Sequence, residues 1–99
     1  MPLFCLHALD KDTDGPALRA ANRPDHLKWS ASHIDKIRMA GPLLSDDGEQ
    51  MIGSVFIFEM DTLADVQALV ATDPYQIAGL SKSVDLRPIK WLVGEGKPE

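Results

Sequence analysis

The sequence contains a ten-residue apolar run, MIGSVFIFEM, at positions 51–60. Its two alternating sets of side chains are both apolar, with Phe56, Phe58 and Met60 on one side and Val55 and Ile57 on the other. A strand with this alternation presents apolar residues to both faces of its sheet. A second run, LFCLHAL at positions 3–9, has the same property. We predict that both are strands of a sheet that must be covered on both faces.

A polar turn, DKDTDG at positions 10–15, follows the first of these strands. Asp14 is placed to cap a brief helical turn that Pro16 opens. A longer helix is predicted to begin near Arg23-Pro24, because proline is preorganised for a first helical turn.

The buried side of that helix is predicted from residues that recur at helical spacing, namely Leu27, Ala31 and Ile34. Gly41-Pro42 is predicted to end it, with glycine as the C-cap and proline preventing continuation. A short strand at residues 43–45 is predicted to follow.

The second half of the chain repeats the pattern. Thr62 is predicted to cap a helix that runs to about Thr72, and a short helical turn follows over residues 73–79. Residues 83–93 are predicted to form the last strand, whose apolar alternation changes phase at Pro88. Such a change indicates a bulge or a strand that leaves the sheet edge.

The predicted order is strand, helix, strand or strand pair, helix, strand, which is typical of an α+β ferredoxin-like sandwich. Two helices in a chain of 99 residues cannot cover both faces of a four-stranded sheet. A second copy of the sheet can. We therefore predict a homodimer that buries about 800 Å² per subunit between the two sheets.

The composition is that of one globular domain. The chain is 44% apolar and 25% charged, with 15 Asp plus Glu against 10 Lys plus Arg, a formal net charge of -5. An acidic chain without a basic cluster is a poor match to nucleic acid, and no apolar run is long enough to span a membrane. The start, MPLFC, has no signal-peptide pattern, and a single cysteine suits a reducing compartment. We expect a cytoplasmic protein that binds neither nucleic acid nor membranes.

His26 is the first candidate for acid/base chemistry. On an ideal helix, Ser30 and His33 share a flank with His26 beside the predicted buried stripe. A histidine at such a boundary can be partly desolvated and exchange protons near neutral pH. The spacing alone also fits a boundary histidine with no chemical task, and favours that interpretation.

Four other residues are candidates for the same site, each with a structural alternative. Asp73 could orient an imidazole by accepting its Nδ1–H, but its position before Pro74 is typical of a helix cap, which is the default interpretation. Ser54 follows a glycine that permits close approach and could donate to a substrate oxygen, or it could lie in a bulge. Arg23 could bind a carboxylate or lie in solvent. Tyr75 could contribute its hydroxyl or pack in the core.

The sequence gives little support for a metal site. Cys5, His7, His26 and His33 are the available soft or borderline ligands, and no pair of them has the spacing of a zinc knuckle. Glycine-rich phosphate loops, nucleophile elbows and dinucleotide fingerprints are also absent from the sequence. We predict no metal and no cofactor.

Several short segments, taken in order, resemble one family. They are RPDHL at 23–27, AGPL at 40–43, Gly53-Ser54, DPY at 73–75 with AGL at 78–80, and the stretch from Val84 to Arg87-Pro88. This order and spacing resemble the YciI-like (YCII-related) family over nearly the whole chain. The resemblance implies a single YCII-related domain over residues 1–99, with a ferredoxin-like subunit that pairs into a dimeric α+β barrel.

The resemblance also implies an active site centred on a histidine and an aspartate. By matching motifs these are His26 in RPDHL and Asp73 in DPY, with Ser54 and Arg23 as neighbours in the pocket. Few members of the family have a settled reaction, and one relative eliminates chloride from a chlorinated hydroxyhydroquinone. Residues 11–21 match no motif of the family.

The predicted function is a small cofactor-free enzyme of the lyase or isomerase kind. Its substrate would be a small oxygenated metabolite with an aromatic or lactone-like ring, contacted by Ser54, Arg23 and Tyr75. His26 would move a proton to or from carbon or a phenolic oxygen, and Asp73 would hold its tautomer and stabilise its cation. The alternative is a non-catalytic dimeric module that binds a small ligand or supports an assembly. A cofactor-independent monooxygenase rests on fold analogy alone.

Overall fold

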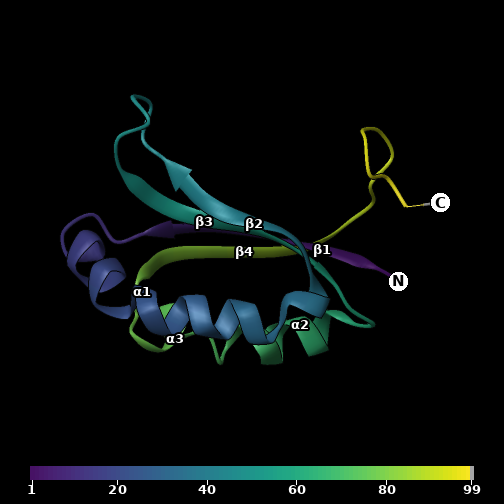
Figure 1. Cartoon of the computed structure of the whole chain (residues 1–99), viewed down its shortest axis with the longest axis horizontal. Helices are drawn as coiled ribbons and strands as arrows, with labels where there is room; N and C mark the ends of the chain where they lie inside the picture. Colours follow the sequence, from purple (N-terminus) through teal and green to yellow (C-terminus); the bar gives the residue numbers. More distant parts are fainter. Residues whose placement is uncertain (99) are drawn as a thin grey trace.

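A computed structural model describes residues 1–98 of the chain. Its elements, in order, are β1 (Leu3–Asp10), α1 (Gly15–Ser32), a 3₁₀ helix (Ile34–Lys36), β2 (Ile37–Leu44), β3 (Met51–Glu59), α2 (Leu63–Val70), α3 (Pro74–Ile77) and β4 (Ser81–Ile89). The four strands form one antiparallel sheet in the order β2-β3-β1-β4. All the helices lie on one side of this sheet (Figure 1). The predicted α+β ferredoxin-like fold is confirmed.

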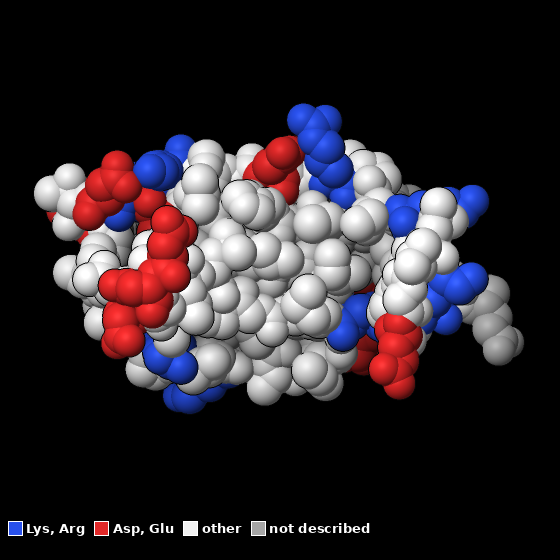
Figure 2. Space-filling model, turned by 90° about the horizontal axis from the view of Figure 1, so that it is seen from above, with Lys and Arg blue, Asp and Glu red and all other residues white. Residues whose placement is uncertain are grey.

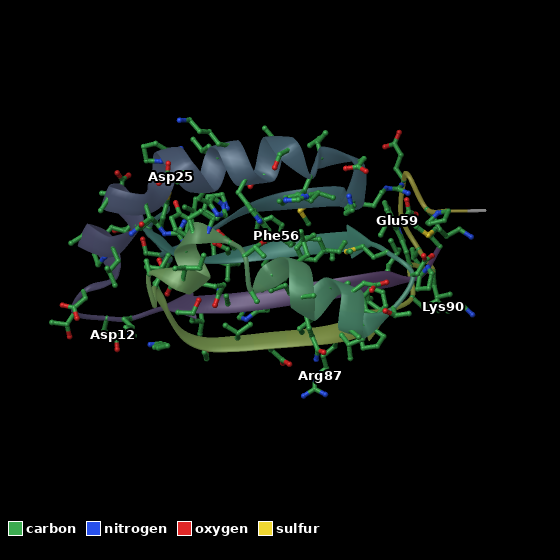
Figure 3. All side chains as sticks on the ribbon, turned by 90° about the horizontal axis from the view of Figure 1, so that it is seen from below. Asp12, Asp25, Phe56, Glu59, Arg87 and Lys90 are labelled. Carbon is green, nitrogen blue, oxygen red and sulfur yellow. The ribbon has the colours of Figure 1, made fainter. Side chains whose placement is uncertain are left out.

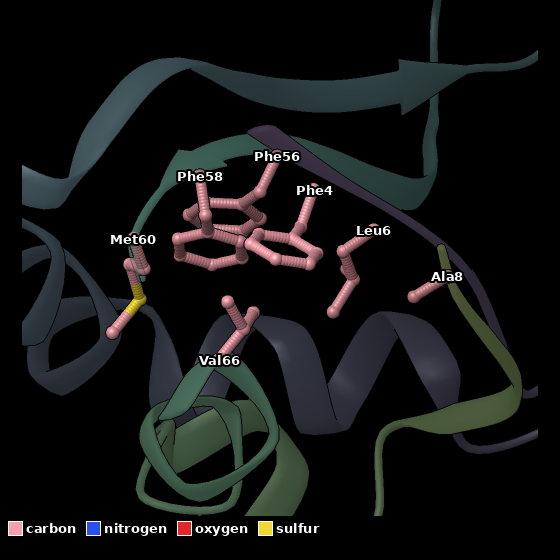
Figure 4. Packing of buried hydrophobic residues seen from close by; sticks show 7 residues of the cluster. All are labelled: Phe4, Leu6, Ala8, Phe56, Phe58, Met60 and Val66. Atoms are coloured by element: carbon pink, nitrogen blue, oxygen red, sulfur yellow. The ribbon is translucent and has the colours of Figure 1, made fainter. Parts of the chain in front are cut away.

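The core lies between the two central strands and the helices. In the β1–β3 register Phe4 pairs with Phe58 and Leu6 with Phe56, so their side chains share the face that the helices cover. The rings of Phe56 and Phe58 stack with their centroids 5.1 Å apart, and Val66 of α2 packs against them (Figure 4). Phe58 and Val66 are completely buried. One apolar set of each predicted strand therefore forms the core, as the alternation indicated.

The first helix begins earlier and ends earlier than predicted. It is continuous from Gly15 to Ser32 with Pro24 inside it, and Asp14 precedes it without a side-chain capping hydrogen bond. The prediction of a separate helix starting near Arg23-Pro24 is wrong. Arg19 and His26, on either side of the proline, are both held in buried contacts, which outweigh the one helical hydrogen bond that proline removes.

The predicted helix end at Gly41-Pro42 is also wrong, because these residues lie inside the strand β2. The strand is at the edge of the sheet and pairs only with β3 among the described residues, with Pro42 opposite Ser54. A proline is tolerated on an edge strand because no second neighbour needs its missing N–H. The short strand predicted at residues 43–45 is the end of β2.

The residues predicted as the buried stripe of the first helix are exposed. Leu27 is 53% exposed and Ile34 is 68% exposed, and Ala31 is exposed as well. The side of α1 that meets the sheet carries the buried side chains of Arg19 and His26 instead. Periodicity identified residues that share a face, but polar partners on β1, on β3 and at the start of α3 decided which face is buried.

The second half of the chain follows the prediction more closely. Thr62 caps α2 by accepting the Asp65 N–H at 3.1 Å, and a short helix, α3, follows. The last strand ends at Ile89 rather than at Val93, so the chain leaves the sheet edge just after Pro88. This is one of the two outcomes that the change of phase indicated.

The face of the sheet opposite the helices carries no further layer within residues 1–98 (Figure 1). We call this the open face. Apart from His7, its central side chains are apolar, in particular Cys5, Leu9, Val55 and Ile57, and each of these four is only partly buried. Figure 2 shows uncharged side chains across the middle of this side of the molecule and charged ones near its margin.

No helix in the described part of the chain is long and apolar enough to cross a bilayer.

Candidate active site

A short hydrogen bond joins His26 to Asp73, although 47 positions separate them in the chain. His26 Nδ1 lies 2.7 Å from Asp73 Oδ1, and both side chains are buried. Asp73 also caps α3, since the same oxygen accepts the Tyr75 backbone N–H at 3.0 Å. An ionised carboxylate can only accept, so the bond holds a proton on Nδ1 and leaves Nε2 as the nitrogen that can take up a proton.

Aromatic rings fix the plane of the His26 imidazole. The Tyr75 ring stacks on it at a centroid distance of 3.9 Å and an angle of 14°. The edge of Phe56 meets it at 6.0 Å, and Trp29 stacks more loosely at 5.9 Å. Trp29 is itself anchored, because its Nε1–H donates to Thr72 Oγ1 at 2.8 Å. Figure 3 shows Phe56 in the middle of the helix-covered side, between α1 and the α2–α3 segment.

Arg19 forms a second buried polar cluster beside the first. Its Nε donates to Asp10 Oδ2 at 2.8 Å, and its Nη2 reaches Asp10 Oδ1 at 3.0 Å, which makes a bidentate ion pair. Nη2 also donates to the Gly53 carbonyl at 2.9 Å and to Ser54 Oγ at 3.1 Å. The guanidinium carbon lies 4.9 Å from the centre of the Tyr75 ring. Arg19 thus connects the start of α1 with β1, β3 and Tyr75.

Gly53 lets two strands approach closely at the edge of this cluster. A Cβ atom at this position would overlap the carbonyl oxygen of Ala8 on β1. The predicted close approach at this glycine is confirmed. The pairing of β2 with β3 also shifts between Leu43 and Leu44, so the predicted irregularity is present as well. Ser54 follows directly, with its side chain on the helix-covered face opposite Ala8.

A pocket of about 260 Å³ opens between α1 and the strands β2 and β3. Four of the five candidate residues line it, namely Arg23, His26, Ser54 and Tyr75. Asp73 does not line this pocket and lies behind His26, as a residue that orients the ring would. The structure thus brings all five candidate residues together. The structural alternatives for two of them also hold, because Asp73 caps α3 and the Tyr75 ring is buried.

Charge and burial determine the state of two groups in the pocket. Burial raises the pKa of Tyr75 above its ordinary value of 10.0, and the cations of Arg19 and Arg23 partly oppose this increase. Burial lowers the pKa of Arg19, but its hydrogen bonds and attraction to Asp10 outweigh that effect and the pKa is raised. Near neutral pH the pocket therefore contains a neutral phenol and a fixed guanidinium.

Arg19 and its partner Asp10 were not predicted from the sequence. Arg19, Arg23 and His26 follow one another at spacings of four and three, which places them on one face of a helix. That signal becomes readable only if the helix begins at Gly15, before the proline. Asp10 shows no comparable signal, because it lies in a run of polar turn residues.

The other two histidines lie apart from this site. His33 follows α1 and meets the Trp29 ring edge-on at 5.3 Å, and its Nδ1 is the one buried side-chain nitrogen or oxygen within residues 1–98 that lacks a partner. His7 is exposed on the open face. Among the residues that the structure describes, no three His, Cys, Asp or Glu side chains gather as metal ligands would.

Comparisons with known proteins find related sequences and similar folds. Protein YciI of Escherichia coli O6:H1 is 33% identical over 95 residues, which cover 89% of this chain and 96% of that protein. Among solved structures, 5-chloro-2-hydroxyhydroquinone dehydrochlorinase (TftG) of Burkholderia phenoliruptrix AC1100 superposes with a TM-score of 0.78 at 27% identity. The match covers 97% of this chain and 99% of that one. That enzyme was solved in complex with 2,5-dihydroxybenzoquinone.

More distant structures share the fold alone. A Nitrosomonas europaea protein assigned as an antibiotic biosynthesis monooxygenase has a TM-score of 0.54 at 17% identity, over 94% of this chain and all of that one. The model of the YCII-related domain matches residues 1–90. With this match and the YciI relative, the chain belongs to the YCII-related domain family.

Proposed function

We propose that the protein is a small acid/base enzyme of the lyase kind, which removes a proton and a leaving group from a small oxygenated ring compound. The observation that carries this proposal is the His26–Asp73 pair at the wall of the pocket. A buried carboxylate that holds one imidazole nitrogen and leaves the other free is the arrangement of a general base.

His26 performs the proton transfer of the elimination, and Asp73 stabilises the charge that this transfer creates. His26 Nε2 takes a proton from carbon or from a ring hydroxyl, and the electron pair left behind forms a new π bond. The leaving group departs with its own bonding pair, so the net loss is one acid molecule and no oxidant is consumed. Asp73 stabilises the imidazolium until its proton passes to water. A positioned histidine contributes about 10²–10⁴-fold to such a step.

Pocket size and lining support a small oxygenated ring as the substrate. The volume of about 260 Å³ is below the range of about 300–1,000 Å³ for drug-sized ligands. Ser54 accepts from Arg19, so its own hydroxyl proton is available to a substrate oxygen. TftG supports the same class, because its named substrate is a chlorinated hydroxyhydroquinone.

The first experiment offers 5-chloro-2-hydroxyhydroquinone to the protein under nitrogen and measures chloride release against a protein-free control. We expect release that His26→Gln and Asp73→Asn reduce by about 10²-fold or more. His33→Gln is the matched control, because it replaces a histidine near the end of the same helix outside the pocket, and it should keep the rate. Equal rates for His26→Gln and the unaltered protein would contradict the proposal.

The non-catalytic module remains the competing function, and one pair of measurements separates the two. An enzyme forms product from some member of a panel of oxygenated ring compounds. A binding module is stabilised against heat by such compounds but leaves each of them unchanged. If compounds of the panel raise the melting temperature and none of them is converted to product, the protein is a binding module and the proposed enzyme activity is rejected.

We also propose that the open face pairs with the open face of a second copy, which would complete the dimeric α+β barrel. The support is the apolar centre of this face, which includes Val55 and Ile57, and its charged margin (Figure 2). Apolar patches of this kind on a small protein are typical of an interaction surface. A homodimer places both pockets on the outer, helix-covered sides and leaves them accessible.

A further inference from the structure

Arg19 is a charged group whose position in the pocket is fixed. Its residue is 7% exposed, and Asp10, Gly53 and Ser54 together hold its Nε and Nη2 atoms. A guanidinium bound in this way cannot swing into solvent, in contrast with Arg23 one helical turn later, which is exposed. The pocket therefore presents one buried, fixed cation and one exposed cation.

One nitrogen of Arg19 is still available. Nη1 takes no part in the four hydrogen bonds of the side chain. Nη1 is also not a fully buried atom without a hydrogen-bond partner, because His33 Nδ1 is the only such side-chain atom within residues 1–98. Arg19 lines the pocket together with Tyr75, whose hydroxyl is its other polar neighbour there. Nη1 has two N–H groups, so one of them remains to donate to a ligand even when the other meets the Tyr75 hydroxyl.

The lining of the pocket is positive, although the chain as a whole is acidic. Arg19 and Arg23 contribute two cations, and no Asp or Glu of residues 1–98 lines the pocket. The Asp10 carboxylate has both oxygens engaged by Arg19 on the side away from Nη1. The formal net charge of -5 lies elsewhere on the surface. A neutral ligand would gain little from this arrangement.

We propose that the pocket binds its substrate as an oxyanion on a planar conjugated ring, held by Arg19 Nη1 with Arg23 closing over it. This inference rests on the proposed function for the pocket and narrows its substrate to compounds that carry an ionised oxygen. Planar N–H groups match such an oxygen geometrically, and charge-assisted hydrogen bonds are about twice as strong as neutral ones. Arg19 is thus the positioning group that orients the ring toward His26.

The test compares benzoate with benzamide, which have nearly the same shape and differ in charge, by calorimetric titration of the unaltered protein. We expect benzoate to bind about tenfold more tightly or better. 2,5-Dihydroxybenzoquinone, ionised at neutral pH, serves as a second anionic probe with the oxygen directly on the ring. The inference is overturned if benzoate and benzamide bind with equal affinity and the ionised quinone binds no more tightly than benzamide.

Substitutions separate the role of the buried cation from that of the exposed one. Arg19→Gln should reduce the affinity for benzoate about 10- to 100-fold and leave benzamide binding unchanged. Arg23→Gln should reduce the affinity for benzoate less, by about fivefold, because the charge of Arg23 is exposed and screened by water. Lys28→Gln is the matched control, since Lys28 is exposed on the same helix and does not line the pocket, and it should keep the affinity unchanged. A greater loss from Arg23→Gln than from Arg19→Gln contradicts the role of Arg19.

A measurement on the unaltered protein covers the case in which Arg19→Gln does not fold. In ¹⁵N side-chain spectra, the guanidinium signals of Arg19 should move with benzoate and stay in place with benzamide. Unmoved signals at saturating benzoate overturn the inference. These probes test binding alone, because they do not react. If the protein binds them through Arg19 but releases no chloride from 5-chloro-2-hydroxyhydroquinone, only the proposed function is contradicted.

Discussion

The imidazole of His26 and the phenol ring of Tyr75 lie face to face, with centroids 3.9 Å apart, and one oxygen of Asp73 holds both residues. It accepts from His26 Nδ1 and from the Tyr75 backbone N–H at the same time. The start of α3 therefore positions His26, Asp73 and Tyr75 as one unit. A change at Asp73 should affect both chemistry and folding, and the two effects can be separated.

Asp73→Asn should lower turnover by about 10²-fold or more while the protein stays folded. The amide oxygen can still cap α3, but the neutral side chain no longer stabilises the imidazolium. Asp73→Ala should add a loss of about 1 kcal/mol in the free energy of unfolding, because the cap is removed as well. Steady-state rates and urea unfolding of both variants test this separation. Normal turnover in Asp73→Asn would exclude the orienting role.

The ionisation of Tyr75 can be followed directly, since it is the only tyrosine of the sequence. Absorbance at the tyrosinate band should give a midpoint above 10.0, because burial raises the pKa of Tyr75. Removing a cation with Arg23→Gln should raise the midpoint further, because Arg23 lowers the pKa of Tyr75. An unchanged midpoint in Arg23→Gln would show that the charge of Arg23 does not reach the hydroxyl.

The same pKa shift has a consequence for stability. A folded-state pKa above the unfolded value stabilises the protein below the unfolded pKa, and this contribution is lost as the pH rises through the folded pKa. The unfolding free energy should therefore fall above about pH 10 in the unaltered protein, and fall less in Tyr75→Phe. Urea unfolding at several alkaline pH values measures the difference between the two.

Gly53→Ala should destabilise the fold by roughly 2–4 kcal/mol, because the new methyl group overlaps the Ala8 carbonyl and forces β1 and β3 apart. Gly41→Ala is the matched control on the neighbouring strand. A Cβ at Gly41 meets no atom within 4 Å, so its effect should be within about 0.5 kcal/mol. Chemical denaturation of the two variants compares them, and similar losses at both positions would contradict the packing described at Gly53.

Ile57→Asp should convert the proposed homodimer into a monomer, because it places a charge in the centre of the open face. Ile34→Asp is the control, since Ile34 is 68% exposed on the helix side and should leave the dimer intact. Size-exclusion chromatography with light scattering at micromolar concentration measures both. A monomeric unaltered protein would reject the dimer.

Much of the fold was readable from local patterns. The double apolar alternation of the first and third strands identified the core strands, and Thr62 and Asp73 were recognised as helix caps. The extent of the first helix was not readable, because Pro24 and the run of Leu27, Ala31 and Ile34 suggested a different start and a different buried face. Both errors have one cause, the burial of paired polar residues where a pattern-based argument expects apolar ones.

The candidate site was also predictable in part from the sequence. Residue types and motif positions were sufficient to identify His26, Asp73, Ser54, Arg23 and Tyr75 from the sequence. Their convergence on one pocket, and the presence of Arg19 among them, depended on contacts between residues 34 to 47 positions apart. Helical and strand periodicity reports which side chains share a face, over a few residues. Which faces meet is decided by long-range pairing and burial, and that information exists only in the folded chain.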